Sequence, residues 1–186
     1  MTSYKQDIRD FLNLERSEKY QIIYADPPWK FIDRTPRESL SSSNQYSTMD
    51  MDELASLPIH KITANSSILF LWVPTSMMIP GIKVMESWGF SYKTKLYWVK
   101  TVKLGTGYYF RNQLEELWVG VQHGVRAFHM PIRNYIEKTP TKHSVKPLEF
   151  IGVIDQVAEK LNIKTKIELF ARTCNDGWDC VGLENE

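Results

Sequence analysis

The chain has 186 residues, of which 42% are hydrophobic and 24% charged, and its formal net charge is +1. This balance is typical of a globular protein and excludes wholesale disorder and fibrous repeats. No apolar run approaches the roughly 18 residues of a membrane span, and the polar N-terminal segment does not resemble a signal peptide. The two cysteines, Cys174 and Cys180, are too few for a disulfide framework. We therefore expect a single domain over residues 1–186 in a reducing cytoplasm.

Short apolar runs and helical patterns alternate along the chain. In chain order they predict a strand at 21–25, a helix at 50–57, a strand at 67–73, a helix at 77–88, strands at 95–99 and 116–121, a helix at 147–161 and a strand at 166–171. The strands are continuously apolar and rich in β-branched and aromatic residues, which is typical of strands covered on both faces. This alternation predicts an α/β fold with a mostly parallel sheet.

Basic residues concentrate in the middle of the chain. Residues 91–147, which we call the basic belt, carry 10 basic and 3 acidic side chains, whereas the rest of the chain is net acidic. Aromatic residues lie between these cations, so the belt could bind phosphates and stack on bases. A solvated basic face above an aromatic core is the alternative. The cations expected to meet phosphates are Lys93, Lys95, Lys103, Arg111, Arg126, Arg133, Lys138 and Lys142.

The first predicted strand ends in Asp26-Pro27-Pro28-Trp29, at the place where open α/β sheets bind ligands. These residues suit an exocyclic amine such as that of adenine, whose lone pair is delocalised into the ring. The Asp26 carboxylate can accept one amine hydrogen and the Pro27 carbonyl the other, which stabilises positive charge that develops on the nitrogen. The prolines fix the backbone without a competing N–H, and Trp29 offers a face for a stacked base. The alternative is a proline-rich turn with a buried tryptophan and a surface aspartate.

This tetrapeptide resembles the catalytic motif of the MT-A70 family of adenine-N6 methyltransferases. The family implies a Rossmann-like methyltransferase fold, with a mostly parallel sheet and helices on both faces, and S-adenosylmethionine as cofactor. The similarity covers nearly the whole chain. Further segments that resemble family blocks, in order, are Gln6-Asp7-Ile8-Arg9, Tyr46-Ser47-Thr48-Met49, Leu69-Phe70-Leu71-Trp72-Val73, Trp88-Gly89-Phe90, Trp98-Val99-Lys100, His143-Ser144-Val145-Lys146-Pro147, Glu168-Leu169-Phe170-Ala171-Arg172 and Gly177-Trp178.

The resemblance also implies roles for individual residues. By position, the cofactor would be bound by Asp7, Ile8, Asp26, Lys100, Phe170, Arg172, Asn175 and Glu184. Asp7 and Ile8 would contact the adenine of the cofactor, and Lys100 would meet its methionine carboxylate as a compact cation. Tyr46, in the family's active-site loop, would help to shape the pocket for the target base. From the charge pattern of the basic belt, rather than from the resemblance, we expect further substrate contacts from Lys103, Arg111, Arg133, Lys142 and Lys146.

We expect the protein to methylate N6 of adenine in DNA, on a base that is flipped out or unpaired. DNA is preferred because the chain resembles small bacterial or phage members of the family and shows no RNA-binding module. The alternatives are N6 methylation of adenine in RNA and a role as a non-catalytic, nucleic-acid-binding partner subunit. A third alternative, methylation of amide nitrogen in protein, is disfavoured because such enzymes prefer asparagine where Asp26 stands. A homodimer or a partner subunit could enlarge the small recognition surface.

Neither a metal nor a membrane enters these expectations. Cys174 and Cys180 do not have the Cys-x₂-Cys spacing of a zinc site, and no second pair accompanies them. We therefore expect no bound metal and no membrane partner.

Overall fold

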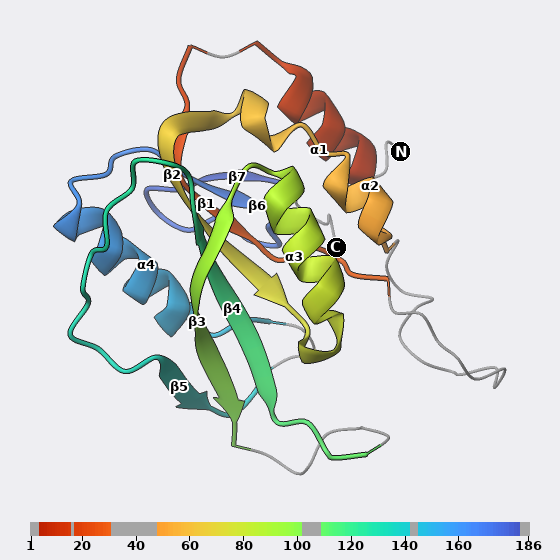
Figure 1. Ribbon diagram of the computed structural model, residues 1–186, viewed down its shortest axis with the longest axis vertical. Coiled ribbons are helices and arrows are strands. Elements are labelled where there is room, and N and C mark those ends of the chain that lie inside the picture. Colours follow the sequence, from red (N-terminus) through yellow and green to blue (C-terminus); the bar gives the residue numbers. More distant parts are fainter. Residues whose placement is uncertain (1–3, 16, 31–47, 102–108, 142–144, 183–186) are drawn as a thin grey trace, which may run out of the picture.

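The computed structural model describes residues 4–15, 17–30, 48–101, 109–141 and 145–182. They form a seven-stranded sheet with the order β5-β3-β4-β2-β1-β6-β7 and helices on both faces (Figure 1). The strands are β1 (Tyr20–Ala25), β2 (Thr63–Val73), β3 (Ser91–Lys100), β4 (Leu114–Val121), β5 (Tyr135–Lys138), β6 (Lys166–Leu169) and β7 (Asp179–Val181). The helices are α1 (Tyr4–Asn13), α2 (Met51–Ala55), α3 (Met78–Ser87) and α4 (Leu148–Lys160), with short 3₁₀ turns at Ile59–Lys61 and Thr75–Met77. Among these helices, none has the length and apolarity that crossing a membrane requires.

The α/β fold expected from the sequence is confirmed. Every predicted strand and helix has its counterpart, and neighbouring strands pair in parallel except where β4 runs antiparallel to β2 and β3. Three elements, α1, β5 and β7, are not predicted by the sequence. The two strands lie at the edges of the sheet and have only 4 and 3 residues, too few to leave an apolar run. Helix α1 lies on the surface and buries a narrow stripe that includes Ile8 and Leu12.

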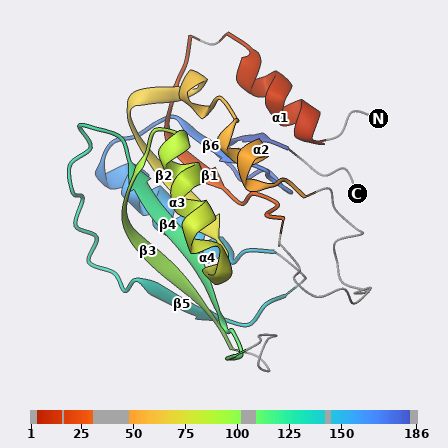
Figure 2. The same cartoon turned by 45° about the vertical axis from the view of Figure 1, so that its right-hand side comes forward.

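Two hydrophobic layers cover the sheet. On β1, Ile23 packs with α1, α2 and α3, whereas Ile22 and Tyr24 point to the opposite face and pack with α4. Figure 2 shows α3 and α4 on opposite sides of β2 and β4. Trp72 and Trp88 lie within these layers and are almost fully buried. Because both faces are covered, strand side chains on either side are apolar, and this produces the continuous apolar runs of the sequence.

The carboxyl ends of several parallel strands lie along one side of the sheet, which we call its carboxyl edge to distinguish it from the lateral edges formed by β5 and β7. Ala25 at the end of β1 pairs with Leu71 of β2 and Leu169 of β6, so the chain leaves these parallel strands at the same edge. Strand β4 runs in the opposite direction and brings its first residues, including Glu115, to this edge beside the end of β3. Side chains that are far apart in the sequence therefore meet close to Asp26.

Candidate active site

The turn at Asp26-Pro27-Pro28-Trp29 follows β1 directly and is held by backbone hydrogen bonds. The amide of Trp29 donates to the carbonyl of Pro27 at 2.9 Å, and the amide of Met49 donates to the carbonyl of Pro28 at 2.8 Å. Trp29 and Met49 also form a parallel bridge that ties the turn to the segment before α2. The two prolines restrict φ, so the turn is rigid. The Pro27 carbonyl retains one lone pair for a further donor.

The indole ring of Trp29 does not have the role expected from the sequence. The residue is only 6% exposed, packs in the hydrophobic layer that contains α2 and α3, and donates from Nε1 to the carbonyl of Trp72 at 2.9 Å. The prediction that Trp29 offers an open face to a base is therefore wrong. A large aromatic ring gains more from burial, provided that its N–H finds an acceptor, and Trp29 meets both conditions. Its function in this structure is to anchor the turn.

Asp26 belongs to a group of four charged side chains, Asp26, Lys146, Glu115 and Lys100, which we call the charge cluster. The Oδ2 atom of Asp26 lies 2.8 Å from Nζ of Lys146, and the same ammonium lies 3.3 Å from Oε2 of Glu115. Glu115 also pairs with Lys100. In addition, Nζ of Lys146 lies 5.2 Å from the centre of the Trp72 ring, a cation–π contact. Lys146 is thus held from three sides.

The charges of the cluster are partly dehydrated, since its side chains are between 15% and 28% exposed. Burial opposes the charge of Lys146, but Asp26 and Glu115 outweigh burial and raise the pKa of Lys146. Burial likewise opposes the charge of Glu115, but Lys146 and Lys100 outweigh it and lower the pKa of Glu115. Lys146 and Glu115 are therefore both charged at neutral pH. The charged ammonium of Lys146 attracts the Asp26 carboxylate and fixes its position.

Glu168, at the end of β6, adds another carboxylate near Asp26. It accepts a hydrogen bond of 3.1 Å from Nδ2 of Asn175. Burial raises the pKa of Glu168 to about 7; the bond from Asn175 opposes this rise, and the charge of Asp26 adds to it. Glu168 therefore exchanges a proton near neutral pH, and a cation bound beside it would favour its ionised form. The pKa of the buried Tyr24 hydroxyl is raised as well, through burial first and Asp26 second.

The segment after β6 carries three residues that the sequence assigns to the cofactor. Phe170 has φ of 62°, a left-handed conformation that bulky residues rarely adopt, and it turns the chain at the end of β6. A Cβ atom on Gly182 would lie 3.0 Å from the Phe170 backbone, so this close approach requires glycine. Arg172 is exposed, and Asn175 bonds to Glu168. The contacts expected from Phe170, Arg172 and Asn175 to a cofactor stay predictions.

Cys174 and Cys180 are joined in a disulfide that closes this segment, with their Cα atoms 5.7 Å apart. The sequence predicts no disulfide framework and a reducing compartment. The structure shows a single disulfide, because the turn after β6 brings Cys174 against Cys180 of β7. Sequence separation alone does not reveal that contact.

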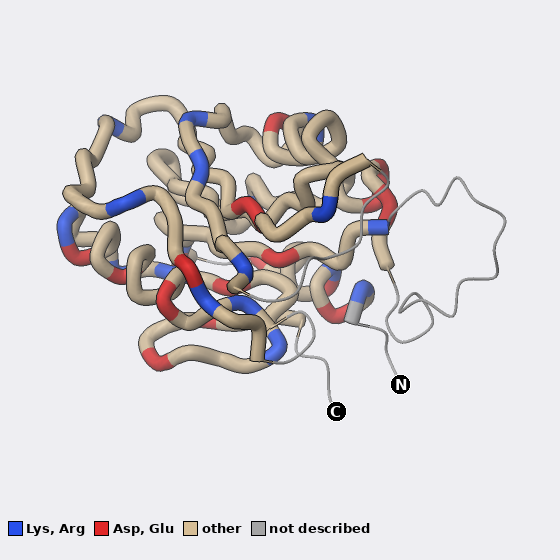
Figure 3. The backbone as a smooth tube through the Cα atoms, turned by 90° about the horizontal axis from the view of Figure 1, so that it is seen from below, with Lys and Arg blue, Asp and Glu red and all other residues tan. Residues whose placement is uncertain are grey.

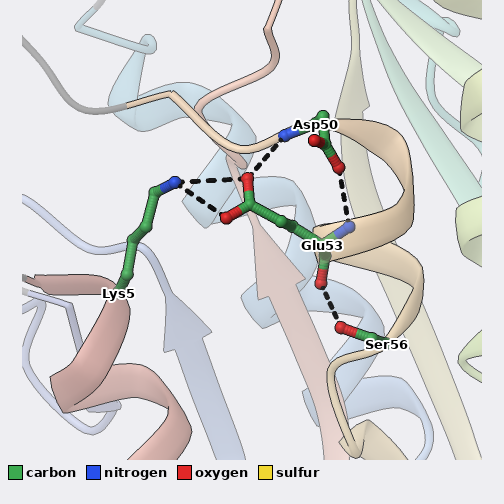
Figure 4. A network of polar contacts seen from close by, with 4 residues as sticks. All are labelled: Lys5, Asp50, Glu53 and Ser56. Carbon is green, nitrogen blue, oxygen red and sulfur yellow. Dashed lines mark hydrogen bonds and ion pairs between the residues drawn. The ribbon is translucent and has the colours of Figure 1, made fainter.

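Helix α1 places the N-terminal segment beside α2. Asp7 is exposed in the first turn of α1, whereas Ile8 is fully buried in the core. Lys5 bonds to both carboxylate oxygens of Glu53 at 3.0 and 3.2 Å, and Glu53 closes a capping box with Asp50 at the start of α2 (Figure 4). This network fixes α1 against α2. The contacts expected from Asp7 and Ile8 to the cofactor adenine stay predictions.

Two of the arginines expected to bind nucleic acid lie on the surface. Arg133 is exposed and donates to a neighbouring tyrosine hydroxyl at 3.2 Å. Arg111 is exposed beside Tyr109 and Phe110, which are 95% and 91% exposed. Lys146 differs, because its ion pairs draw it into the charge cluster and away from a surface role. Figure 3 shows how basic and acidic positions are distributed along the backbone.

Other expected contacts are engaged elsewhere or lie outside the described residues. Lys95 pairs with Glu116 at 2.9 Å, and Lys138 pairs with Glu149, so these cations are partly neutralised. Tyr46, Lys103, Lys142 and Glu184 lie outside the described residues. In the part of the chain that is described, no three His, Cys, Asp or Glu side chains gather in a way that could hold a metal ion.

Two hollows of the molecule lie away from Asp26. One, of about 470 Å³, is lined by β3, β4, α4 and the segment 125–134. The other, of about 200 Å³, is lined by residues 125–127, β1, β2 and the segment after α4. Neither is lined by a residue of the charge cluster. The candidate site is therefore defined by its ionic contacts and by the ends of the strands.

Glu115 and Glu168 are not predicted as site residues from the sequence. Glu168 is the single acidic residue within the apolar run 166–171, and a charge within a buried strand is a signal that could have found it. Glu115 has no comparable signal, because it reaches Asp26 only through the antiparallel direction of β4. The position of Lys146 beside Asp26 likewise depends on the tertiary fold.

Known proteins similar to this chain identify its family. The sequence matches the MT-A70 family over residues 20–184, a range that includes β1, Asp26 and Glu168. The chain belongs to the MT-A70 family. The resemblance seen in the sequence is thus confirmed, and with it the methyltransferase class.

Relatives within the MT-A70 family differ in how much of their length this chain covers. The Type II methyltransferase M.MunI of Mycoplasma sp is 35% identical over 190 residues, which cover 90% of this chain and 78% of M.MunI. The N(6)-adenosine-methyltransferase catalytic subunit METTL3 of Homo sapiens is 29% identical, over 97% of this chain and 30% of METTL3. A putative N(6)-adenosine-methyltransferase MT-A70-like protein of Medicago truncatula is 29% identical, over 95% of this chain and 28% of its own length. The chain therefore spans most of M.MunI but less than a third of the other two.

Proposed function

We propose that this chain transfers a methyl group from S-adenosylmethionine to the N6 amine of adenine in DNA. The observation that carries the proposal is the setting of Asp26. Its carboxylate follows β1 at the edge where the strands end, and Lys146 binds its Oδ2 atom at 2.8 Å. The other oxygen, Oδ1, can then accept a hydrogen from a target amine. A carboxylate held in one place costs little reorganisation during the reaction.

The charges at this edge fit S-adenosylmethionine, which when bound supplies an electrophilic methyl group on a cationic sulfonium. The described residues at this edge include three carboxylates and two ammonium groups. The carboxylates belong to Asp26, Glu115 and Glu168, and the ammonium groups to Lys100 and Lys146. With Glu168 ionised, these groups carry a formal net charge of −1, which favours a cation. The carboxylates suit an amino group or ribose hydroxyls, and the ammonium groups suit a carboxylate.

Asp26 and the turn that follows it would act on the target amine. The Pro27 carbonyl accepts the Trp29 amide at 2.9 Å and keeps one lone pair. Two acceptors, Asp26 Oδ1 and this carbonyl, would orient the nitrogen lone pair and stabilise the positive charge that develops on nitrogen. A proton can leave after that charge has formed, so no strong base is required.

The surface features support a nucleic acid as substrate. Arg111 and Arg133 supply exposed cations, and Tyr109 and Phe110 supply aromatic faces on which bases can stack. DNA is favoured because the chain covers most of M.MunI, a Type II methyltransferase. RNA is the second candidate, because the relatives named N(6)-adenosine-methyltransferases match nearly the whole of this chain.

The test is to incubate the purified chain with methyl-labelled S-adenosylmethionine and matched single- and double-stranded DNA and RNA oligonucleotides. The oligonucleotides are then digested and the labelled nucleoside is identified. We expect N6-methyl-2′-deoxyadenosine from DNA. Label found only in N6-methyladenosine from RNA would move the substrate to RNA. A folded protein that labels none of the oligonucleotides would contradict the proposal and favour a non-catalytic partner subunit.

The role of Asp26 has its own test. Asp26→Ala should lower turnover by about 100-fold or more, because it removes an acceptor of the charge that develops on nitrogen. Asp26→Asn keeps the shape of the side chain and isolates the effect of the charge. Asp52→Ala, at an exposed carboxylate of α2, is the matched control and should retain turnover. Near-normal turnover of folded Asp26→Ala would refute the role.

A further inference from the structure

The disulfide between Cys174 and Cys180 encloses a short ring of the chain next to the candidate site. The two cysteines are six positions apart: Cys174 lies in the turn after β6, and Cys180 lies within β7. Cys174 is exposed and Cys180 is half-buried, so the disulfide lies at the protein surface, where small thiols in solution can approach it. Exposed disulfides of this kind are the ones that exchange readily with thiols.

The ring holds one residue that contacts the site, Asn175, and one that anchors the ring in the core, Trp178. Asn175 donates to Glu168 at 3.1 Å, and burial together with Asp26 raises the pKa of Glu168. Trp178 is buried, packs edge to face on Tyr24 and donates from Nε1 to Asp155 at 3.1 Å. The Trp178 amide also donates to the Asn175 carbonyl at 3.1 Å. The geometry of the ring therefore sets where the Asn175 side chain meets Glu168.

We propose that Cys174 and Cys180 form a reversible thiol–disulfide modification site that controls the affinity for the cofactor. This inference rests on the proposed function, because it assumes that the cofactor binds beside Glu168 and Asn175. On oxidation, the two thiols give up two protons and two electrons and form the S–S bond, and one molecule of oxidised glutathione becomes two of glutathione. Reduction by two molecules of glutathione reverses the exchange through a mixed disulfide.

The closed ring should favour binding by limiting the conformations of the segment that carries Asn175. In the reduced protein this segment samples more conformations, and ordering it on binding costs affinity. The rest of the fold should depend little on the bond. Strand β7 is also held by its pairing with β6, and Trp178 by its burial in the core, so we expect the reduced protein to stay folded.

The experiment uses the full chain, equilibrated with either oxidised or reduced glutathione. Blocking of free thiols with iodoacetamide, followed by intact mass measurement, counts the thiols in each state. Titration calorimetry with S-adenosylmethionine then gives the affinity in each state. We expect no modified cysteine in the oxidised protein, two in the reduced protein, and cofactor binding about five- to tenfold weaker after reduction.

Cys180→Ser and Cys174→Ser serve as controls that cannot form the bond. Both should bind the cofactor with the affinity of the reduced protein, and neither should respond to oxidised glutathione. Two free thiols after treatment with oxidised glutathione would overturn the inference, as would equal affinity in the two redox states. Cofactor binding in neither state would instead contradict the proposed function, and the thiol count would still report whether the bond forms.

Discussion

Glu168 should make the free energy of unfolding depend on pH, and Glu168→Gln should remove this dependence. Its pKa is raised from an ordinary value of 4.5 to about 7, first by burial and further by Asp26. A carboxyl group with a raised pKa stabilises the fold fully below its unfolded pKa, and this stability is lost as the pH rises through the folded pKa. In Glu168→Gln the side chain keeps an acceptor for Asn175 but cannot ionise. The variant should therefore lack this loss.

The size of the effect follows from the two pKa values. With 4.5 for the unfolded chain and about 7 for the fold, the loss between about pH 5 and about pH 8 amounts to about 2.5 kcal/mol. Water reaches the half-buried carboxylate of Glu168, so we expect about 2 kcal/mol. Most of this loss should occur below about pH 7, because the unfolded chain releases its proton there while the fold retains it.

The assay is urea denaturation of wild type and Glu168→Gln at several values between about pH 5 and pH 8. The difference in free energy of unfolding between variant and wild type should grow with pH by about 2 kcal/mol in favour of the variant. Glu149→Gln is a matched control, because Lys138 lowers rather than raises the pKa of the exposed Glu149. Parallel curves for wild type and Glu168→Gln would refute the raised pKa.

Three further results can be anticipated. Lys146→Met leaves the carboxylates of Asp26 and Glu115 without their shared cation, so urea denaturation at neutral pH should show a free energy of unfolding lower by about 2 kcal/mol. A decrease of less than about 0.5 kcal/mol would contradict the charge cluster. Arg133→Ala should weaken nucleic-acid binding and reduce the slope of log affinity against log salt concentration, because it removes a phosphate contact. Tyr109→Ala should weaken binding but leave this slope unchanged, because it removes a stacking contact. A slope for Arg133→Ala equal to that of the wild type would exclude Arg133 from the phosphate contacts. Trp29→Phe removes the donor to the buried carbonyl of Trp72 and should destabilise the fold by about 2 kcal/mol, and an unchanged urea midpoint would mean that this bond does not anchor the turn.

Local sequence was sufficient for the inner strands of the sheet and for the turn at Asp26. A strand buried on both faces needs apolar residues throughout, so β1, β2, β4 and β6 are visible as runs. Two prolines after such a run dictate φ whatever their surroundings, so the rigidity of the turn could be anticipated. The short edge strands β5 and β7 could not, because their pairing depends on the neighbouring strand rather than on their own few residues.

Sequence by itself determined where the chain is apolar, where it must turn and which residue types follow β1, because these properties depend on neighbouring residues alone. Tertiary structure decided which side chains meet there. The antiparallel direction of β4 brings Glu115 to Asp26, the segment before α4 supplies Lys146, and packing turns the ring of Trp29 into the core. Strand order and direction result from packing over the whole chain, so no local pattern could specify which charges surround the carboxylate of Asp26.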